Sequence, residues 1–338
     1  MSKGKLIVLV GPTGVGKTSL SIALSQRLKC PIISADSRQL YRELPIGTAM
    51  PTPLERSLAT HYMVGTASIF DTYSVAQYED EVINLLENRV FPTSQYALLS
   101  GGSMLYVDAI VKGLDEIPSI RSEIREELQK RWQEEGLVSL LSELKTIDLP
   151  YYNHVDHNNY KRVLHGLEVY YSSGAPLSSY WKGTPQKRSF DVIKILVERP
   201  REELWQRINL RTLQMFKDGW LAEAWALYPY RHLNALNTIG YKEIFALFSQ
   251  GFDYDALNEA QSELWRKIGS NVLPAIQFQD LSPAARSLQQ AIRLIQKKTR
   301  IYARQQMTWW KKHPDIIPFP ANGDALDLIA LLREKDLI

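Results

Sequence analysis

The chain has 338 residues, of which 45% are hydrophobic and 23% charged, and a formal net charge of +3. These values are ordinary for a globular protein of about two domains and exclude a disordered or low-complexity chain. The single cysteine, Cys30, excludes an internal disulfide framework and fits a reducing compartment. No stretch approaches the roughly 18 apolar residues that a membrane helix needs. We therefore expect a cytoplasmic protein that does not enter a membrane.

The first predicted elements are a strand, a glycine-rich loop and a helix. Leu6–Val10 is a short apolar run typical of a buried parallel strand, and residues 19–28 carry a helical apolar pattern. Between them, residues 11–18 read GPTGVGKT and match the phosphate-binding pattern GxxxxGK[ST] completely. Glycines let backbone N–H groups turn towards a phosphate, and the helix N-terminus adds partial positive charge. The pattern predicts a diphosphate-binding loop made of Gly11, Pro12, Thr13, Gly14, Gly16, Lys17 and Thr18.

Two side chains of this loop have predicted roles. Lys17 would reach the outer phosphates, and the Thr18 hydroxyl is placed to ligate Mg²⁺. The alternative is a glycine-rich turn without a ligand, which the complete match and the strand–loop–helix context disfavour. The pattern indicates phosphate but does not identify a nucleotide.

A second predicted strand ends close to a carboxylate. Ile32 and Ile33 form its apolar run, so Asp36 falls near its C-terminal end. Ligands bind at this edge of open α/β sheets, where Asp36 could ligate a metal or act as a base. The alternative is that Asp36 caps the segment that follows.

A third predicted strand, Tyr96–Ser100, ends in two glycines and Ser103. This loop would bring its backbone and the Ser103 hydroxyl close to a ligand, although a purely structural pair of glycines fits equally well. No strand in this region ends in aspartate, as the metal-binding strand of nucleotide hydrolases does. The nearest is Val192–Val197, which is followed by Glu198. This absence counts against a plain ATPase.

Together these segments resemble the tRNA dimethylallyltransferase family. The blocks DSRQxY and IGTA behind the loop are far more specific than the loop itself, and the resemblance covers nearly the whole chain. It rests on GPTGVGKT (11–18), ISADSRQLYRELPIGTA (33–49), GGSMLY (101–106), KRVLHGLEV (161–169), RINLRTLQMFKDGWLAE (207–223), TIGYKE (238–243) and TRIYARQQMTWW (299–310).

The resemblance implies an α/β fold in which a P-loop nucleoside-triphosphate-hydrolase-like core with a parallel sheet carries a helical insertion and long C-terminal helices. We place the core at residues 1–113 and 184–338. The insertion, at 114–183, would clamp the anticodon stem-loop of tRNA. The family's clamp is built within one chain, so we expect a monomer.

The resemblance also implies the reaction. A dimethylallyl group would pass from dimethylallyl diphosphate, bound with Mg²⁺, to the exocyclic N6 of the adenosine adjacent to the anticodon in tRNAs reading U-starting codons. Asp36 would be the general base, and Ser103 stands where a threonine hydrogen-bonds the same amino group. Lys17 and Arg211 would contact the diphosphate, with Thr18 and Asp36 near the metal. The implied tRNA contacts are Ser37, Arg38, Gln39, Arg162, Arg300 and Arg304.

The C-terminal segment points to nucleic acid independently. Residues 281–314 contain eight lysines or arginines and no acidic residue, and Ser282-Pro283 is a good helix start. One basic stripe would suit a phosphate backbone: Arg293, Lys297, Arg300, Arg304 and Lys311. An apolar stripe would dock on the core: Leu288, Ile292, Ile295, Tyr302 and Trp309. Trp309 and Trp310 could stack on bases, although burial is favoured.

Further helices are expected at residues 120–145, as an amphipathic pair, and at 204–227. Departures from the family pattern include Ser103, His165, Gln305, residues 159–160 and an unmatched segment near 260–288. We expect these departures to affect the affinity for tRNA more than the catalytic activity. The alternatives are prenyl transfer to free AMP, ADP or ATP, a small-molecule kinase, and a tRNA-binding paralogue that has lost catalysis.

Overall fold

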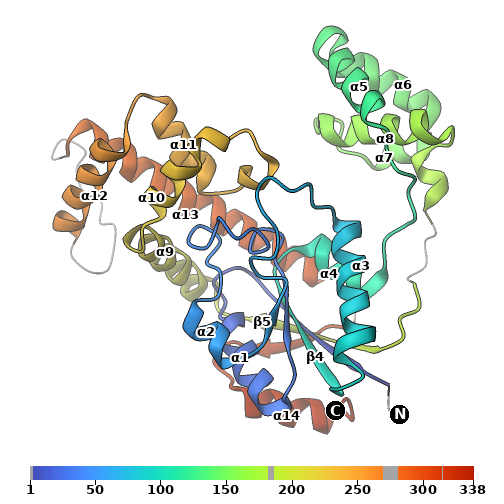
Figure 1. Ribbon diagram of the computed structural model, residues 1–338, viewed down its shortest axis with the longest axis vertical. Helices are drawn as coiled ribbons and strands as arrows, with labels where there is room; N and C mark the ends of the chain where they lie inside the picture. Colours follow the sequence, from blue (N-terminus) through green and yellow to red (C-terminus); the bar gives the residue numbers. More distant parts are fainter. Residues whose placement is uncertain (1–2, 182–185, 269–280, 314) are drawn as a thin grey trace. The chain divides into compact units, whose positions relative to one another are not determined.

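The computed structural model describes residues 3–181, 186–268, 281–313 and 315–338. The chain forms two compact units, one of residues 1–111 with 188–338 and the other of residues 112–187 (Figure 1). The expected boundary between residues 113 and 114 lies close to the first observed one. The expected boundary between 183 and 184 falls outside the described residues.

The larger unit is built on a parallel sheet of six strands in the order β3-β2-β4-β1-β5-β6. The predicted α/β fold class and the four predicted strands are confirmed. β3 and β6 carried no readable pattern, because β3 has two residues and β6 contains two prolines, which only an edge strand tolerates. The strands are β1 Lys5–Val10, β2 Ile32–Ala35, β3 His61–Tyr62, β4 Tyr96–Gly101, β5 Asp191–Glu198 and β6 Ile317–Pro320.

Both faces of this sheet are covered. Alternate residues of β1 enter different cores, with Leu6 and Val8 on one face and Ile7 and Leu9 on the other. Figure 1 shows the strands between α1 (Lys17–Leu28) and α3 (Val75–Leu85). The other helices of this unit are α2 Pro53–Leu58, α4 Met104–Lys112, α9 Arg201–Lys217, α10 Trp220–Leu227, α11 Tyr241–Ser249, α12 Tyr254–Ile268, α13 Pro283–Trp310 and α14 Ala325–Glu334.

Glycines separate consecutive helices in both of the regions that were expected to be helical. The helix expected at 204–227 ends at Lys217, and a new one begins at Trp220. Gly219 between them has a φ of 103°, which a residue with a side chain rarely adopts. In the smaller unit, Gly136 (φ 81°) likewise separates α5 (Ser122–Glu135) from α6 (Leu137–Ile147). The pair of helices expected at 120–145 is confirmed, whereas the break at Gly219 was not predicted.

Helix α13 begins as predicted, with the Ser282 side chain accepting from the backbone N–H of Ala285. Leu288, Ile292 and Ile295 are buried, which confirms the first half of the apolar stripe. The second half is wrong at Trp309, which is 39% exposed, whereas Trp310 is 1% exposed, as favoured. A straight helix drifts by about 20° per seven residues, so steps of seven from Leu288 leave the buried face before residue 309. The face continues instead through Ala303, Gln306 and Trp310.

The smaller unit is helical. Besides α5 and α6 it contains α7 (Leu149–His154) and α8 (Tyr160–Ser173), which surround a core of Leu128, Leu140, Leu144, Val163 and Leu167. The buried carboxylate of Asp148 accepts hydrogen bonds from the backbone N–H groups of Tyr151 and Ser178. Across the described helices of both units, none combines the length and apolarity needed to span a bilayer.

Candidate functional site

The phosphate loop has the backbone that its sequence predicted. Gly11, Gly14 and Gly16 have φ angles of 149°, 81° and 115°. A Cβ atom on Gly11 would lie 2.6 Å from the carbonyl oxygen of Val197 on β5. The loop therefore depends on glycine both for its conformation and for its close approach to the sheet.

Two cationic side chains, those of Lys17 and Arg211, face this loop. The Lys17 ammonium donates to the carbonyls of Gly11 at 2.8 Å and Pro12 at 3.0 Å. Arg211 on α9 donates to the Thr13 hydroxyl at 3.2 Å. Burial and the nearby Arg211 lower the pKa of Lys17 to about 7, while Asp36 opposes this shift. Burial also lowers the pKa of Arg211. Both shifts would be relieved by an anion, so the arrangement suits a charged phosphate ligand.

Asp36 lies in the turn after β2 and uses one of its oxygens structurally. Its Oδ1 accepts from the backbone N–H of Arg38 at 2.9 Å and of Gln39 at 3.3 Å. Its Oδ2 accepts no hydrogen bond from the described residues. The capping role and the chemical role proposed from the sequence are thus compatible, because each can use a different oxygen.

Ser103 is brought to the same turn. Its hydroxyl oxygen accepts from the backbone N–H of Ser37 at 2.8 Å, and its hydroxyl donates to the Ser37 hydroxyl at 3.2 Å. The close approach requires glycine, since a Cβ on Gly101 would lie 2.1 Å from the carbonyl oxygen of Ala35. Gly101, the last residue of β4, therefore allows Ser103 to contact the turn that carries Asp36.

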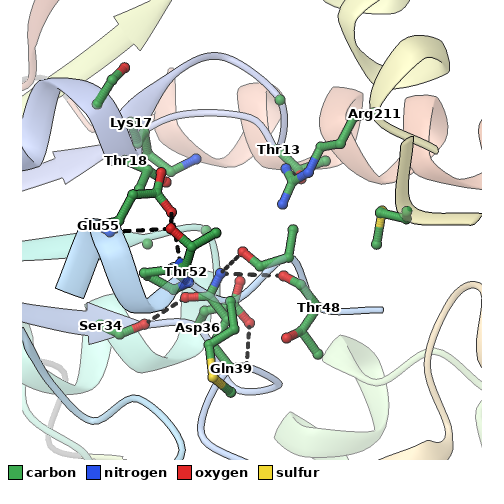
Figure 2. Close-up of a pocket in the computed structure, with 18 of the residues that line it drawn as sticks. Thr13, Lys17, Thr18, Ser34, Asp36, Gln39, Thr48, Thr52, Glu55 and Arg211 are labelled. Atoms are coloured by element: carbon green, nitrogen blue, oxygen red, sulfur yellow. Dashed lines mark hydrogen bonds between the residues drawn. The ribbon is translucent and has the colours of Figure 1, made fainter. Parts of the chain in front are cut away.

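These residues line two adjoining cavities of about 1020 and 500 Å³. The larger contains Lys17, Thr18 and an apolar wall, and the smaller contains Ser37, Ser103 and Thr238. Figure 2 shows Lys17 and Arg211 on one side of the larger cavity and Asp36, Gln39 and Thr48 on the other. The apolar wall includes Ile46, Met50, Val64, Leu213 and Met215. Six residues line both cavities, namely Thr13, Asp36, Thr48, Arg211, Met215 and Tyr302.

Thr18 and Asp36, the predicted metal ligands, both line the larger cavity. The Thr18 side chain is exposed and forms no hydrogen bond with the described part of the chain. Within the same residues, no three His, Cys, Asp or Glu side chains gather as a metal cage. A free hydroxyl and a free carboxylate oxygen fit Mg²⁺, which usually keeps several waters and binds substrate phosphates through few protein ligands.

Two positioning residues of the site were not predicted. Glu223 on α10 accepts the backbone N–H groups of Ile46 and Gly47, each at 2.8 Å, and the hydroxyl of Tyr241 at 2.5 Å. Gln306 on α13 accepts the N–H of Thr13 at 2.9 Å. Both residues lie inside the blocks used for the resemblance, but nothing in their local sequence indicates these partners.

The predicted tRNA contacts are distributed over both units. The Arg38 guanidinium donates to the carbonyls of Asn234 and Ala235, and Gln39 donates to those of Thr48 and Ala49. Ser37 lines the smaller cavity. On α13, Arg300 is bound to Asn209, whereas Arg304 is exposed. Arg162 is exposed on α8 of the smaller unit.

Comparison with known proteins gives consistent matches. A family model described as IPP transferase matches residues 39–313. A tRNA dimethylallyltransferase 2 from Porphyromonas gingivalis is 44% identical over 97% of this chain and 97% of its own. A tRNA isopentenylpyrophosphate transferase structure from Bacillus halodurans has a TM-score of 0.63 at 27% identity, covering 99% of this chain and 96% of that one. A eukaryotic dimethylallyltransferase acting on tRNA, with a TM-score of 0.75 at 22% identity over 99% and 79% of the two chains, shares the fold.

Proposed function

The chain belongs to the IPP transferase family, and on that premise we propose that it transfers a dimethylallyl group from dimethylallyl diphosphate to tRNA. The acceptor atom is the exocyclic N6 of the adenosine adjacent to the anticodon in tRNAs reading U-starting codons. The observation that carries this proposal is the pair of cavities that adjoin at Asp36, with Lys17 and Arg211 in the larger one.

The larger cavity suits the donor. Its two cations and the loop amides would bind the diphosphate, and its apolar wall would contact the dimethylallyl chain. As the carbon–oxygen bond breaks, the electron pair leaves with the diphosphate, and the cations stabilise the charge where it develops. Mg²⁺, which the Thr18 hydroxyl and the diphosphate would hold near Asp36, would supply further neutralisation of the diphosphate, and Oδ2 of Asp36 would stay available to the acceptor amine.

The smaller cavity suits the acceptor adenine. Its amine is a poor nucleophile, because the nitrogen lone pair is delocalised into the ring. As the N6–carbon bond forms, N6 must lose a proton, and the free Oδ2 of Asp36 would accept it. A positioned base of this kind contributes roughly 10²- to 10⁴-fold in rate. Ser103, in the wall of the same cavity, would hydrogen-bond the amine.

The tRNA itself is the proposed partner, bound through its anticodon stem-loop. An unpaired loop base can enter a pocket at a cost of a few kcal/mol. The exposed Arg304 and Lys297 of α13 would contact backbone phosphates, and the helical unit of residues 112–187 would clamp the stem. We propose that one monomer performs the whole reaction.

The test is transfer of radiolabelled dimethylallyl diphosphate, with Mg²⁺, to unmodified tRNA reading U-starting codons, with free AMP and ATP as parallel acceptors. Label on tRNA alone is the expected result. Label on AMP or ATP would replace the proposal with a free-nucleotide prenyltransferase. Label on neither acceptor, with tRNA still bound, would indicate a binding protein.

A further inference from the structure

Two aromatic rings lie together in solvent on the larger unit. Phe70 is 61% exposed and Tyr230 is 40% exposed, and their ring centroids are 5.0 Å apart in an edge-to-face pair with an interplanar angle of 86°. We call this pair the aromatic shelf. Neither ring takes part in the site described above. An exposed pair of this kind needs an explanation, because burying apolar rings elsewhere would stabilise the fold.

The loop that carries Phe70 is held firmly. Glu43 accepts the Ser68 hydroxyl at 2.6 Å and the Ile69 N–H at 3.0 Å, and Asp71 accepts the Ser68 N–H at 2.7 Å. The exposure of Phe70 therefore belongs to a defined conformation with satisfied hydrogen bonds, which presents the ring outwards.

The shelf is tied from the Phe70 side to the turn that follows Asp36. The N–H of Gly65 donates to the carbonyl of Gln39, and the N–H of Ala67 donates to the carbonyl of Leu40. In return, Ala67 accepts from the N–H of Arg42. Residues 65–70 are thus an extension of the turn that carries the proposed base.

The Tyr230 side is tied to the same turn. Arg38 donates to the carbonyls of Asn234 and Ala235, only a few residues after Tyr230. The same segment then continues to Asn237 and Thr238, which line the smaller cavity. Both segments that carry the aromatic shelf are therefore connected to residues that line the proposed acceptor cavity.

We propose that the aromatic shelf stacks an unpaired base of the tRNA anticodon loop that neighbours the adenine in the smaller cavity. This inference rests on the proposed function and assigns one of its acceptor contacts. Bases of single-stranded loops are commonly stacked on aromatic side chains. Arg231, 4.5 Å from the Tyr228 ring, adds positive charge beside the shelf. The carboxylate of Asp71 next to Phe70 disfavours a phosphate and favours the neutral face of a base.

The test uses the full chain with Phe70→Ala, Phe70→Trp as a conservative variant, and Leu326→Ala as a control. Leu326 is also an exposed apolar residue, at 51%, and it belongs to α14, a helix that Figure 1 shows at the end of the sheet opposite α10 and α11. Affinity is measured for an anticodon stem-loop RNA and for versions with an abasic nucleotide at each position flanking the target adenosine. The Michaelis constant for dimethylallyl diphosphate is measured in parallel.

Phe70→Ala should weaken binding of the intact RNA by roughly tenfold, since a stacked base contributes about 1–3 kcal/mol. Phe70→Trp and Leu326→Ala should bind the RNA with the affinity of the parent. The Michaelis constant for dimethylallyl diphosphate should be the same in all variants. One abasic position should weaken the parent but not Phe70→Ala. Unchanged affinity in Phe70→Ala, or equal losses from the abasic RNAs in both proteins, would overturn the proposed stacking role of the aromatic shelf. If one abasic position weakens binding by the parent but not by Phe70→Ala, and yet no label reaches tRNA in the transfer assay, the proposed function is wrong and the stacking role of the aromatic shelf is retained.

Discussion

The side chain of Gln306, near the end of α13, joins the phosphate loop to the turn that carries Ser103. Its oxygen accepts the N–H of Thr13 at 2.9 Å, and its nitrogen donates to the carbonyl of Gly102 at 2.8 Å. Gln306 is 1% exposed, so water cannot replace either partner. A single buried amide thus sets the spacing between the proposed donor and acceptor sides of the reaction.

Gln306→Leu should therefore lower both stability and turnover. The substitution keeps much of the volume but leaves the Thr13 N–H without its partner, at a cost of about 1–3 kcal/mol. We expect turnover to fall roughly tenfold or more, since small displacements of reacting groups are costly. Urea denaturation and steady-state kinetics would measure the two effects. Gln305→Leu, at the exposed neighbouring position, is the control; equal effects of both variants would contradict the linking role.

Asp36→Asn should separate chemistry from structure. The asparagine oxygen can still accept from the N–H groups of Arg38 and Gln39, so the turn should remain. Because the amide cannot accept the N6 proton, we expect a single-turnover rate about 10²- to 10⁴-fold lower, with tRNA affinity retained. If Asp36→Asn kept the turnover of the parent, Asp36 would not be the general base.

Binding of inorganic diphosphate should be coupled to proton uptake at Lys17. In the free protein the pKa of Lys17 is lowered to about 7 from 10.5, so the amine loses its proton as the pH rises through 7. A bound anion favours the charged form, so affinity should decline between about pH 7 and 9. Between pH 7 and 10.5, Lys17 is protonated in the unfolded chain but largely neutral in the folded one. The unfolded chain therefore holds more protons, and the free protein should gain stability as the pH rises through this range.

Calorimetry at pH 8 in buffers of different ionisation enthalpy measures this uptake. Lys17→Arg stays protonated and is the control, since protonation of the diphosphate itself is common to both proteins. The parent should take up more protons than Lys17→Arg. Equal uptake by the two would show that Lys17 is already charged before the anion binds.

Glu223→Gln should loosen the loop whose Ile46 lines the larger cavity and whose Gly47 lines the smaller one. One oxygen remains where the carboxylate accepts from Ile46, Gly47 and Tyr241, and the new amide N–H₂ would face one of these donors. We expect the catalytic efficiency for the donor to fall by about tenfold, since breaking a buried hydrogen bond costs about 1–3 kcal/mol. Tyr241→Phe should have a smaller effect, because both backbone contacts remain. If Tyr241→Phe were the more damaging variant, Glu223 would not be what holds the loop.

Arg304→Ala and Arg300→Ala should differ in their effect on the stability of the protein. Arg304 is exposed, so its loss should weaken tRNA binding and lower the slope of affinity against salt by about one, without affecting stability. Arg300 donates to Asn209 at 2.6 Å, so its loss should also reduce the melting temperature. Binding titrations between about 50 and 200 mM salt, with thermal melts, distinguish the two. A salt slope unaffected by Arg304→Ala would exclude a phosphate contact there.

Much of the site could be predicted because its parts are local. The phosphate loop is eight consecutive residues with a strand before and a helix after it, and the glycine pattern specifies its backbone. Asp36 and Ser103 each follow a strand of a parallel sheet, so the fold alone brings them to one edge.

What the sequence by itself determined about this protein is therefore its family, its sheet and the residues at the sheet's ligand-binding edge. Only the tertiary structure decided which side chains join these parts. Gln306 and Thr13 are 293 positions apart, and Phe70 and Tyr230, whose rings are in contact, are 160 positions apart. A hydrogen bond or ring contact between distant segments leaves no periodicity along the chain. The packing of α13 likewise decided that Trp310 is buried and Trp309 exposed, because a straight helix turns by 100° between neighbours.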